Sequence, residues 1–282
     1  VRVRDYDQDT VTDNITIAIT DAATPTGGTA SNTVDEEGLS NGIIGGPNDA
    51  TGANTTVTGT LGYNFGGDGA ASTGAFTWST AGLPGLSSGG TALVYSVSAD
   101  GLTLTGAKTG GGATVFTVKV TDLATGAYEF KLLLPLDHSA PVSPVTSDED
   151  DIPLSFGYTV KDDDGSTATG SLGITIDDDS PTVDLLPNIG ASVVEGATYN
   201  GTWSSGYGAD GAGSTKVLVG ANEYDLNTDI ALASGTLRVN SDGTWRFQAA
   251  NGLDQDVVNS QSFSVRVRDY DQDTVTDNIT IA

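Results

Sequence analysis

The sequence contains no cysteine and no methionine, and it has only 11 basic residues against 37 acidic ones. Without cysteine, neither disulfides nor thiolate-bound metals can stabilise the fold. The formal net charge of −26 argues against nucleic acids and anionic membranes as partners, because both are bound through cationic surfaces. No apolar run approaches the roughly 18 residues of a membrane-spanning helix, so no membrane insertion is expected.

A chain this acidic that works outside the cell without disulfides needs another source of stability, and bound divalent cations are one. The 38 glycines and the high acidity would also suit a disordered chain. Strong patterning of the apolar residues favours a folded one instead. A length of 282 residues allows about two domains, each with its own core.

The stretch VRVRDYDQDTVTDNITIA occurs twice, letter for letter, at Val1–Ala18 and at Val265–Ala282. A long fixed period indicates an array of repeated units. The chain therefore spans one repeat unit, preceded by the tail of another. Val and Ile alternate with polar residues on both sides of an Asp-rich turn, which predicts a β-hairpin.

Short strand-like segments alternate with Gly, Asp and Asn turns along the whole chain, without helix signals. Leu154–Ile176 aligns with the copied hairpin, so that Asp162 corresponds to Asp269 and Asp164 to Asp271. Many short strands at this spacing predict an all-β fold of tandem immunoglobulin-like or cadherin-like β-sandwich domains. The expected parts are the closing hairpin of the preceding repeat (1–21), an enlarged β-sandwich (22–180) and a second β-sandwich (181–282), which includes a strand at Ala191–Glu195.

Several motifs resemble the repeats of giant bacterial adhesins. Ser98–Lys108 (SADGLTLTGAK), Ala127–His138 (AYEFKLLLPLDH) and the later DDDSP at Asp177–Pro181 resemble the 143-residue repeats of type I secreted, RTX-type adhesins. Ser234–Leu253 (SGTLRVNSDGTWRFQAANGL) is similar to the VCBS-type and related immunoglobulin-like repeats of the same proteins. The resemblance implies a calcium-dependent extracellular protein, secreted to the bacterial cell surface, in which tandem domains extend an adhesive tip. Glycine-rich GGxGxD calcium repeats have one poor match, at Gly66–Gly69, so no parallel β-roll is expected.

Alternating Asp residues in the hairpin turns point to calcium, which favours six to eight oxygen ligands. The turns do not fit an EF-hand, because the twelfth position counted from Asp269 is Thr280 rather than Glu. The alternative is that these residues are solvated turn formers. Repulsion among so many close carboxylates favours a bound cation, and Mg²⁺ demands a stricter octahedral geometry than Ca²⁺.

Topology suggests where the ligands meet, since the turn between the last two strands of a sandwich lies at the pole where the first strand begins. We therefore expect the turn at Asp269 to meet the linker Asp177–Asp179, with Glu195 nearby. The turn at Asp162 is expected to meet Asp21, with Glu36 or Glu37 assisting. The predicted Ca²⁺ ligands are Asp5, Asp7, Asp9, Asp21, Glu37, Asp162, Asp164, Asp177, Asp178, Asp179, Glu195, Asp269, Asp271 and Asp273.

The function expected is that of a calcium-rigidified, non-catalytic extender whose partners are neighbouring repeat domains of the same chain. His138 is the only histidine, and a structural role near a strand end is expected for it rather than catalysis. The alternative is a module near the adhesin tip that binds a peptide or glycan. In this alternative, the ligand would be bound by the irregular stretches Gly38–Asn54 and Gly66–Gly90, and Trp203 and Tyr207 would be exposed aromatic residues.

Overall fold

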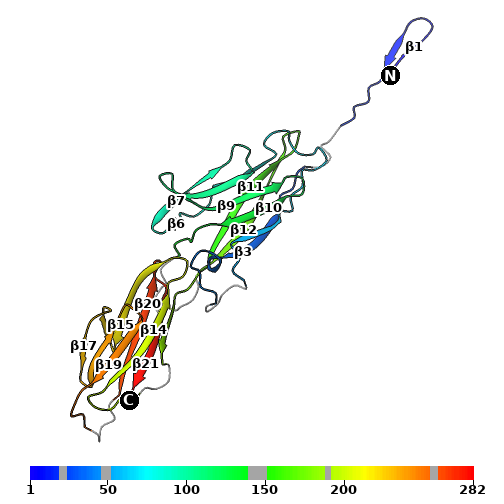
Figure 1. Cartoon of the computed structure of the whole chain (residues 1–282). Coiled ribbons are helices and arrows are strands. Elements are labelled where there is room, and N and C mark those ends of the chain that lie inside the picture. Colours follow the sequence, from blue (N-terminus) through cyan, green and yellow to red (C-terminus); the bar gives the residue numbers. More distant parts are fainter. Residues whose placement is uncertain (19–23, 46–51, 139–150, 188–191, 255–259) are drawn as a thin grey trace.

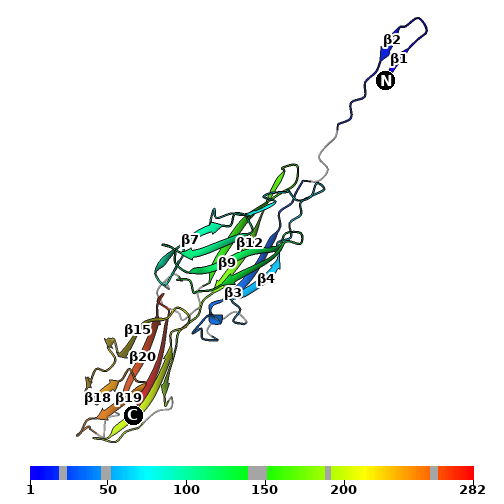
Figure 2. The ribbon, with the colours of Figure 1, turned by 45° about the horizontal axis from the view of Figure 1, so that its top comes forward.

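The computed structural model describes residues 1–18, 24–45, 52–138, 151–187, 192–254 and 260–282. Strands dominate these ranges, and their one helical element is a 3₁₀ turn at Glu36–Gly38. Two β-sandwiches lie end to end, and a small hairpin stands apart beyond the first of them (Figures 1 and 2). The predicted all-β sandwich fold is confirmed. Within the described ranges, no helix has the length and apolar character needed to cross a membrane.

The first sandwich packs a six-stranded sheet, in the order β4-β10-β9-β8-β7-β6, against a four-stranded sheet, β3-β12-β11-β5. Alternate residues of these strands point into one hydrophobic core, at whose centre Phe156 packs 5.7 Å from Phe116 and 5.8 Å from Phe130, measured between ring centroids. The strands are β3 Thr29–Asp35, β4 Thr56–Thr60, β5 Phe76–Trp78, β6 Ser87–Ser88, β7 Thr91–Val97, β8 Thr103–Lys108, β9 Thr114–Asp122, β10 Ala127–Leu132, β11 Ile152–Lys161 and β12 Thr167–Asp177.

Strand β3 pairs parallel to β12, from Thr29 beside Ser171 to Asp35 beside Asp177. The sequence does not predict a strand at Thr29–Asp35, because TASNTVD has little apolar alternation. Parallel pairing makes the first and last strands of this sandwich end at the same pole. The acidic residues that follow β3 therefore lie beside those that follow β12.

The second sandwich packs a five-stranded sheet, β13-β14-β19-β18-β17, against a four-stranded sheet, β16-β15-β20-β21. Its separate core contains Trp245 and Phe263, whose ring centroids are 5.2 Å apart. The strands are β13 Thr182–Leu186, β14 Thr198–Gly206, β15 Ala212–Val219, β16 Asn222–Tyr224, β17 Ile230–Leu232, β18 Gly235–Val239, β19 Thr244–Ala249, β20 Gln261–Asp269 and β21 Thr274–Ile281.

The prediction of a strand at Ala191–Glu195 is wrong, because residues 192–195 form no strand. Ala191 lies outside the described residues. The chain turns at Glu195, and Gly196 adopts a positive φ of 69°. Before that turn, the backbone N–H of Val193 donates to the Ala282 carbonyl at 3.0 Å. Strand β13, which precedes it, occupies the sheet position beside β14 instead.

The two copies of the repeated stretch adopt the same hairpin register. In β1 (Arg2–Arg4) and β2 (Thr10–Thr12), Val3 faces Val11, as Val267 faces Val275 in the second sandwich. In both turns the central Gln has a positive φ, and the last Asp backbone N–H donates to the first Asp carboxylate. The turn is therefore specified by its own sequence, whether or not a domain surrounds it.

Replacing Phe156 by Ala should lower the free energy of unfolding of the first sandwich by about 3–5 kcal/mol, because it leaves a cavity among packed aromatic rings. Differential scanning calorimetry should show the loss in one transition. Val94→Ala is the matched control, since Val94 is 51% exposed. An unchanged transition in Phe156→Ala would contradict this description of the core.

Candidate metal centre

Acidic residues from both sandwiches meet where the two domains touch. The end of β3 supplies three of them, the end of β12 and the linker after it three more, and the β20–β21 turn three. The loop between β14 and β15 adds one, and a single histidine follows β10. We call this group the junction cluster: Asp35, Glu36, Glu37, His138, Asp177, Asp178, Asp179, Asp210, Asp269, Asp271 and Asp273.

The junction cluster is buried although it is almost entirely acidic. Nine of its acidic residues are only 0–8% exposed. Two unit charges of like sign about 4 Å apart repel by roughly 4 kcal/mol at the effective dielectric constant typical of proteins. Burial of so many carboxylates therefore requires protons or cations to offset their charge.

Three sets of side chains in the junction cluster could each hold a metal ion, their ligand atoms lying within 4.8 Å of one another. One set comes from the β20–β21 turn alone, one joins the linker to two residues of the second sandwich, and one joins the linker to two residues of the first. Asp178 belongs to the last two sets, so the linker carboxylate is shared. The three sets are Asp269, Asp271 and Asp273; Asp178, Asp210 and Asp271; and Glu36, His138 and Asp178.

Several buried carboxylate oxygens in the junction cluster have no hydrogen-bond partner within the described part of the chain. They include Oε2 of Glu36, Oδ2 of Asp210, Oδ2 of Asp269 and Oδ1 of Asp271. Buried polar atoms are almost always hydrogen-bonded in folded proteins. These oxygens thus have the chemistry of ligands for a hard cation, since Ca²⁺ takes carboxylate oxygens.

Burial raises the pKa values of several carboxyl groups in the junction cluster. Desolvation, followed by the charges of neighbouring acids, raises the pKa of Asp269 to about 9 and that of Asp210 to about 11. Desolvation also raises the pKa of Asp178 to about 7, against the opposing effect of His138. It raises the pKa of Asp179 to about 6 despite hydrogen bonds from two backbone N–H groups. Without a cation, the cluster thus retains protons that exposed carboxyls release.

The N-terminal hairpin shows what the same turn does alone. Asp5, Asp7 and Asp9 correspond to Asp269, Asp271 and Asp273, and their carboxylates also come within 4.8 Å of one another. All three are exposed. A hydrogen bond with the Asp7 side chain holds the pKa of Asp5 below its ordinary value. The convergence of carboxylates is therefore local, whereas their burial depends on the neighbouring domain.

The domains also touch through neutral groups around the junction cluster. The backbone N–H of His138 donates to Oδ2 of Asp271 at 3.0 Å. The Asp179 carboxylate accepts hydrogen bonds from the backbone N–H of Ile43, at 3.2 Å, and of Ala209, at 2.6 Å. A Cβ on Gly206 would meet the tip of the Ile43 side chain at 2.4 Å, so the two domains pack closely at this glycine.

A second acidic group lies at the other pole of the first sandwich, where Asp68, Asp162 and Asp164 come within 4.8 Å of one another. Asp162 is fully buried and its Oδ2 lacks a hydrogen-bond partner among the described residues. Asp21, expected as a partner, lies outside the described residues. Glu37 was expected at this pole but lies in the junction cluster, because β3 carries the chain across the whole sandwich before it.

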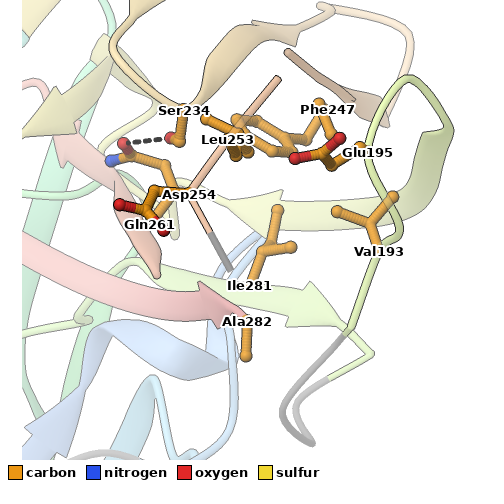
Figure 3. Close-up of a pocket in the computed structure, with 10 residues that line it drawn as sticks. Val193, Glu195, Ser234, Phe247, Leu253, Asp254, Gln261, Ile281 and Ala282 are labelled. Atoms are coloured by element: carbon orange, nitrogen blue, oxygen red, sulfur yellow. Dashed lines mark hydrogen bonds between the residues drawn. The ribbon is translucent and has the colours of Figure 1, made fainter. Parts of the chain in front are cut away.

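The prediction that Glu195 lies near the linker Asp177–Asp179 is wrong, because Glu195 is not part of the junction cluster. It lies near Val193 and Phe247 at the opposite pole of the second sandwich, in a pocket that Ala282 also lines (Figure 3). Its carboxylate accepts a hydrogen bond from the backbone N–H of Gly252 at 3.3 Å. Strand β13 runs the length of the sandwich before Glu195, and so moves it away from the linker.

Five members of the two acidic groups are not among the predicted ligands: Asp35, Glu36, Asp68, Asp210 and His138. Asp35 was hidden because β3 was not predicted, although the neighbouring glutamates were considered. Asp68 and Asp210 stand alone in glycine-rich runs, where no spacing marks them. His138 carries a signal, because it is the single histidine of the sequence and directly follows Asp137.

A family model described as "Domain of unknown function (DUF5801)" matches residues 31–175, about half of the chain, and the chain belongs to this family. No curated protein matches the sequence. The matched range is almost the whole first sandwich, from β3 to β12. It therefore contains Asp35–Glu37 and His138, but not the acids of the linker or of the second sandwich.

Among solved structures, the chain is similar to cadherin ectodomains. Mouse clustered PcdhgC3 EC1-3 has 12% identity and a TM-score of 0.28, covering 92% of this chain and 67% of its own. Drosophila N-cadherin EC1-4 has 10% identity and a TM-score of 0.26, covering 92% and 50%. Protocadherin Gamma B2 EC3-6 has 11% identity and a TM-score of 0.27, and this chain spans 46% of its length. Likenesses this weak carry no functional argument.

The stability of the metal-free chain should fall as pH rises. The junction carboxyls have folded-state pKa values above the unfolded value of about 4, so the stability they contribute is complete below that pH. It is lost as pH rises through about 6 to 9, the values for Asp179, Asp178 and Asp269. In chelator, the melting temperature should therefore drop between pH 5 and pH 9. An unchanged melting temperature would show that these carboxyls are not buried together.

Proposed function

We propose that this chain is a calcium-stiffened extender segment, in which Ca²⁺ held by the junction cluster fixes one domain against the next. The observation that carries the proposal is the burial of nine acidic side chains from two domains at one contact. Such a contact is unfavourable without cations and favourable with them. The proposed role of the segment is mechanical rather than catalytic.

The residues present fit calcium. The cluster offers carboxylate oxygens from four segments, several of them buried without a hydrogen-bond partner among the described residues. Asp178, Asp210 and Asp271 would hold an ion between the domains, and Asp269 and Asp273 would extend the ligand set. Bound Ca²⁺ would supply positive charge that neutralises these carboxylates. Because Asp178 lies in the linker and Asp271 in the β20–β21 turn, binding of one ion by both would hold these two segments together.

The repeated sequence supports an array of such joints. Val1–Ala18 carries the same carboxylate turn as the second sandwich, in the same hairpin register. Together with the adhesin-like motifs, this supports a secreted bacterial cell-surface protein in which many units form a stalk. The segment would be flexible where calcium is scarce and stiff outside the cell.

The aromatic residues favour this reading over a ligand-binding platform. Trp78 and Trp245 are buried in the two cores. Trp203 and Tyr207 pack against the second core, and the Trp203 indole N–H donates to the Asn240 carbonyl at 2.9 Å. These side chains therefore serve packing, and no array of exposed rings is found among them.

Calcium should raise the melting temperature, and Asp271→Asn should weaken this effect. Ligand at about 100 times its dissociation constant stabilises a folded chain by about 2.7 kcal/mol. We expect Asp271→Asn to weaken calcium binding about tenfold or more, measured by titration calorimetry. Asp7→Asn is the matched control, because Asp7 occupies the same position in the identical exposed hairpin.

The same variants separate loss of binding from misfolding. In chelator, Asp271→Asn should melt at or above the temperature of the unmodified chain, since it removes one repelling charge from the cluster. Equal calcium affinity in Asp271→Asn and the unmodified chain would overturn the proposed site. No rise in melting temperature with calcium would overturn the proposed function itself.

Calcium should also narrow the distribution of distances between the two sandwiches. The chain has no native cysteine, so spin labels can be placed on Val94→Cys in the first sandwich and Val194→Cys in the second, both at exposed positions. Double electron–electron resonance should give one narrow distance peak in calcium and a broad distribution in chelator. Equal widths in both conditions would show that the joint is not calcium-dependent.

A further inference from the structure

Glu36, His138 and Asp178 differ from the rest of the junction cluster because they include a nitrogen ligand. The three side chains come from the end of β3, the segment after β10 and the interdomain linker, and their ligand atoms lie within 4.8 Å of one another. All three are buried. Calcium sites are built from oxygen, whereas imidazole suits zinc and other first-row transition metals.

We propose that these three residues form a separate site for a transition-metal ion, of which Zn²⁺ is the best match. His138 Nε2 lies 3.5 Å from Oε1 of Glu36. Ligands bound to one tetrahedral zinc at about 2.0–2.1 Å are separated by roughly that distance. Three protein ligands leave one coordination position for water or another carboxylate oxygen.

The Glu36 carboxylate supplies a second, independent indication of a ligand. Its side chain is 0% exposed, and Oε2 has no hydrogen-bond partner among the described residues. Its other oxygen accepts from the backbone N–H of Leu136 at 2.9 Å and faces His138. One oxygen is thus anchored by the segment that carries the histidine, while the other is available to a cation.

The surrounding contacts hold the histidine in place. The backbone N–H of His138 donates to Asp271 of the second sandwich, and that of Asp137 donates to the Ser87 carbonyl at 2.9 Å. His138 Nδ1 lies 3.7 Å from Oδ2 of Asp178. The imidazole is therefore fixed between the two domains.

The site rests on the junction described above but not on calcium binding, since it needs only the three side chains. It shares Asp178 with the oxygen-only set. A chain that failed to bind calcium could still bind zinc, and the reverse also holds. The experiment below keeps these two outcomes apart.

The single histidine makes the test direct. Zn²⁺ is titrated into the tag-free chain in a buffer with millimolar Ca²⁺, by calorimetry and by NMR of the one imidazole group. We expect one zinc per chain, a shifted imidazole resonance, and binding at least about tenfold weaker in His138→Gln and in Glu36→Gln. Asp13→Asn, at an exposed position outside all of the acidic sets, should bind zinc like the unmodified chain.

Two results would overturn the site: zinc affinity that is equal in His138→Gln and the unmodified chain, or an imidazole resonance that zinc leaves unmoved. Calcium affinity within about twofold of normal in His138→Gln shows that this variant folds and keeps the oxygen-only sites. Glu36→Gln repeats the test without changing the histidine, so a folding defect in one variant does not decide the outcome.

Discussion

Mutual repulsion among buried carboxylates is the constraint on which the contact between the two sandwiches depends. Each domain completes its own hydrophobic core, and those cores share no residue. What joins the domains is mainly polar: acidic side chains that lose their water when the sandwiches meet. The stability of the contact therefore depends on the protons or cations that offset these charges.

The junction cluster depends on both local and long-range structure. Turns such as the one at Asp269 shape themselves, as the freestanding copy at Asp5 demonstrates with the same register and the same capping hydrogen bond. The linker acids and Glu36 are brought to these turns only when the sandwiches fold and dock. A cation bound in the junction cluster would therefore link the turn at Asp269, which forms on its own, to linker acids and Glu36, which reach it only after both sandwiches have folded and docked.

Local patterns in the sequence predicted most strands and the central acids of the junction. Alternating Val, Ile and Phe residues mark β11, β19 and β20, and acidic spacing marks the turn at Asp271. Long-range pairing could not be predicted in the same way. β3 is polar, and its parallel pairing with β12 decides where Glu37 lies, while β13 decides where Glu195 lies. Asp210 and His138 join the cluster through loops whose paths depend on packing of the whole domain.

The parallel pairing of β3 with β12 has a mechanical consequence for a chain that is pulled from both ends. Tension enters the first sandwich at the start of β3 and leaves it at the end of β12, which are opposite ends of a register that runs from Thr29 to Asp35. The two strands are then loaded in shear, so that the backbone hydrogen bonds between them resist together rather than opening one after another. The polar strand that sequence patterns overlook is the one across which a stalk would transmit force.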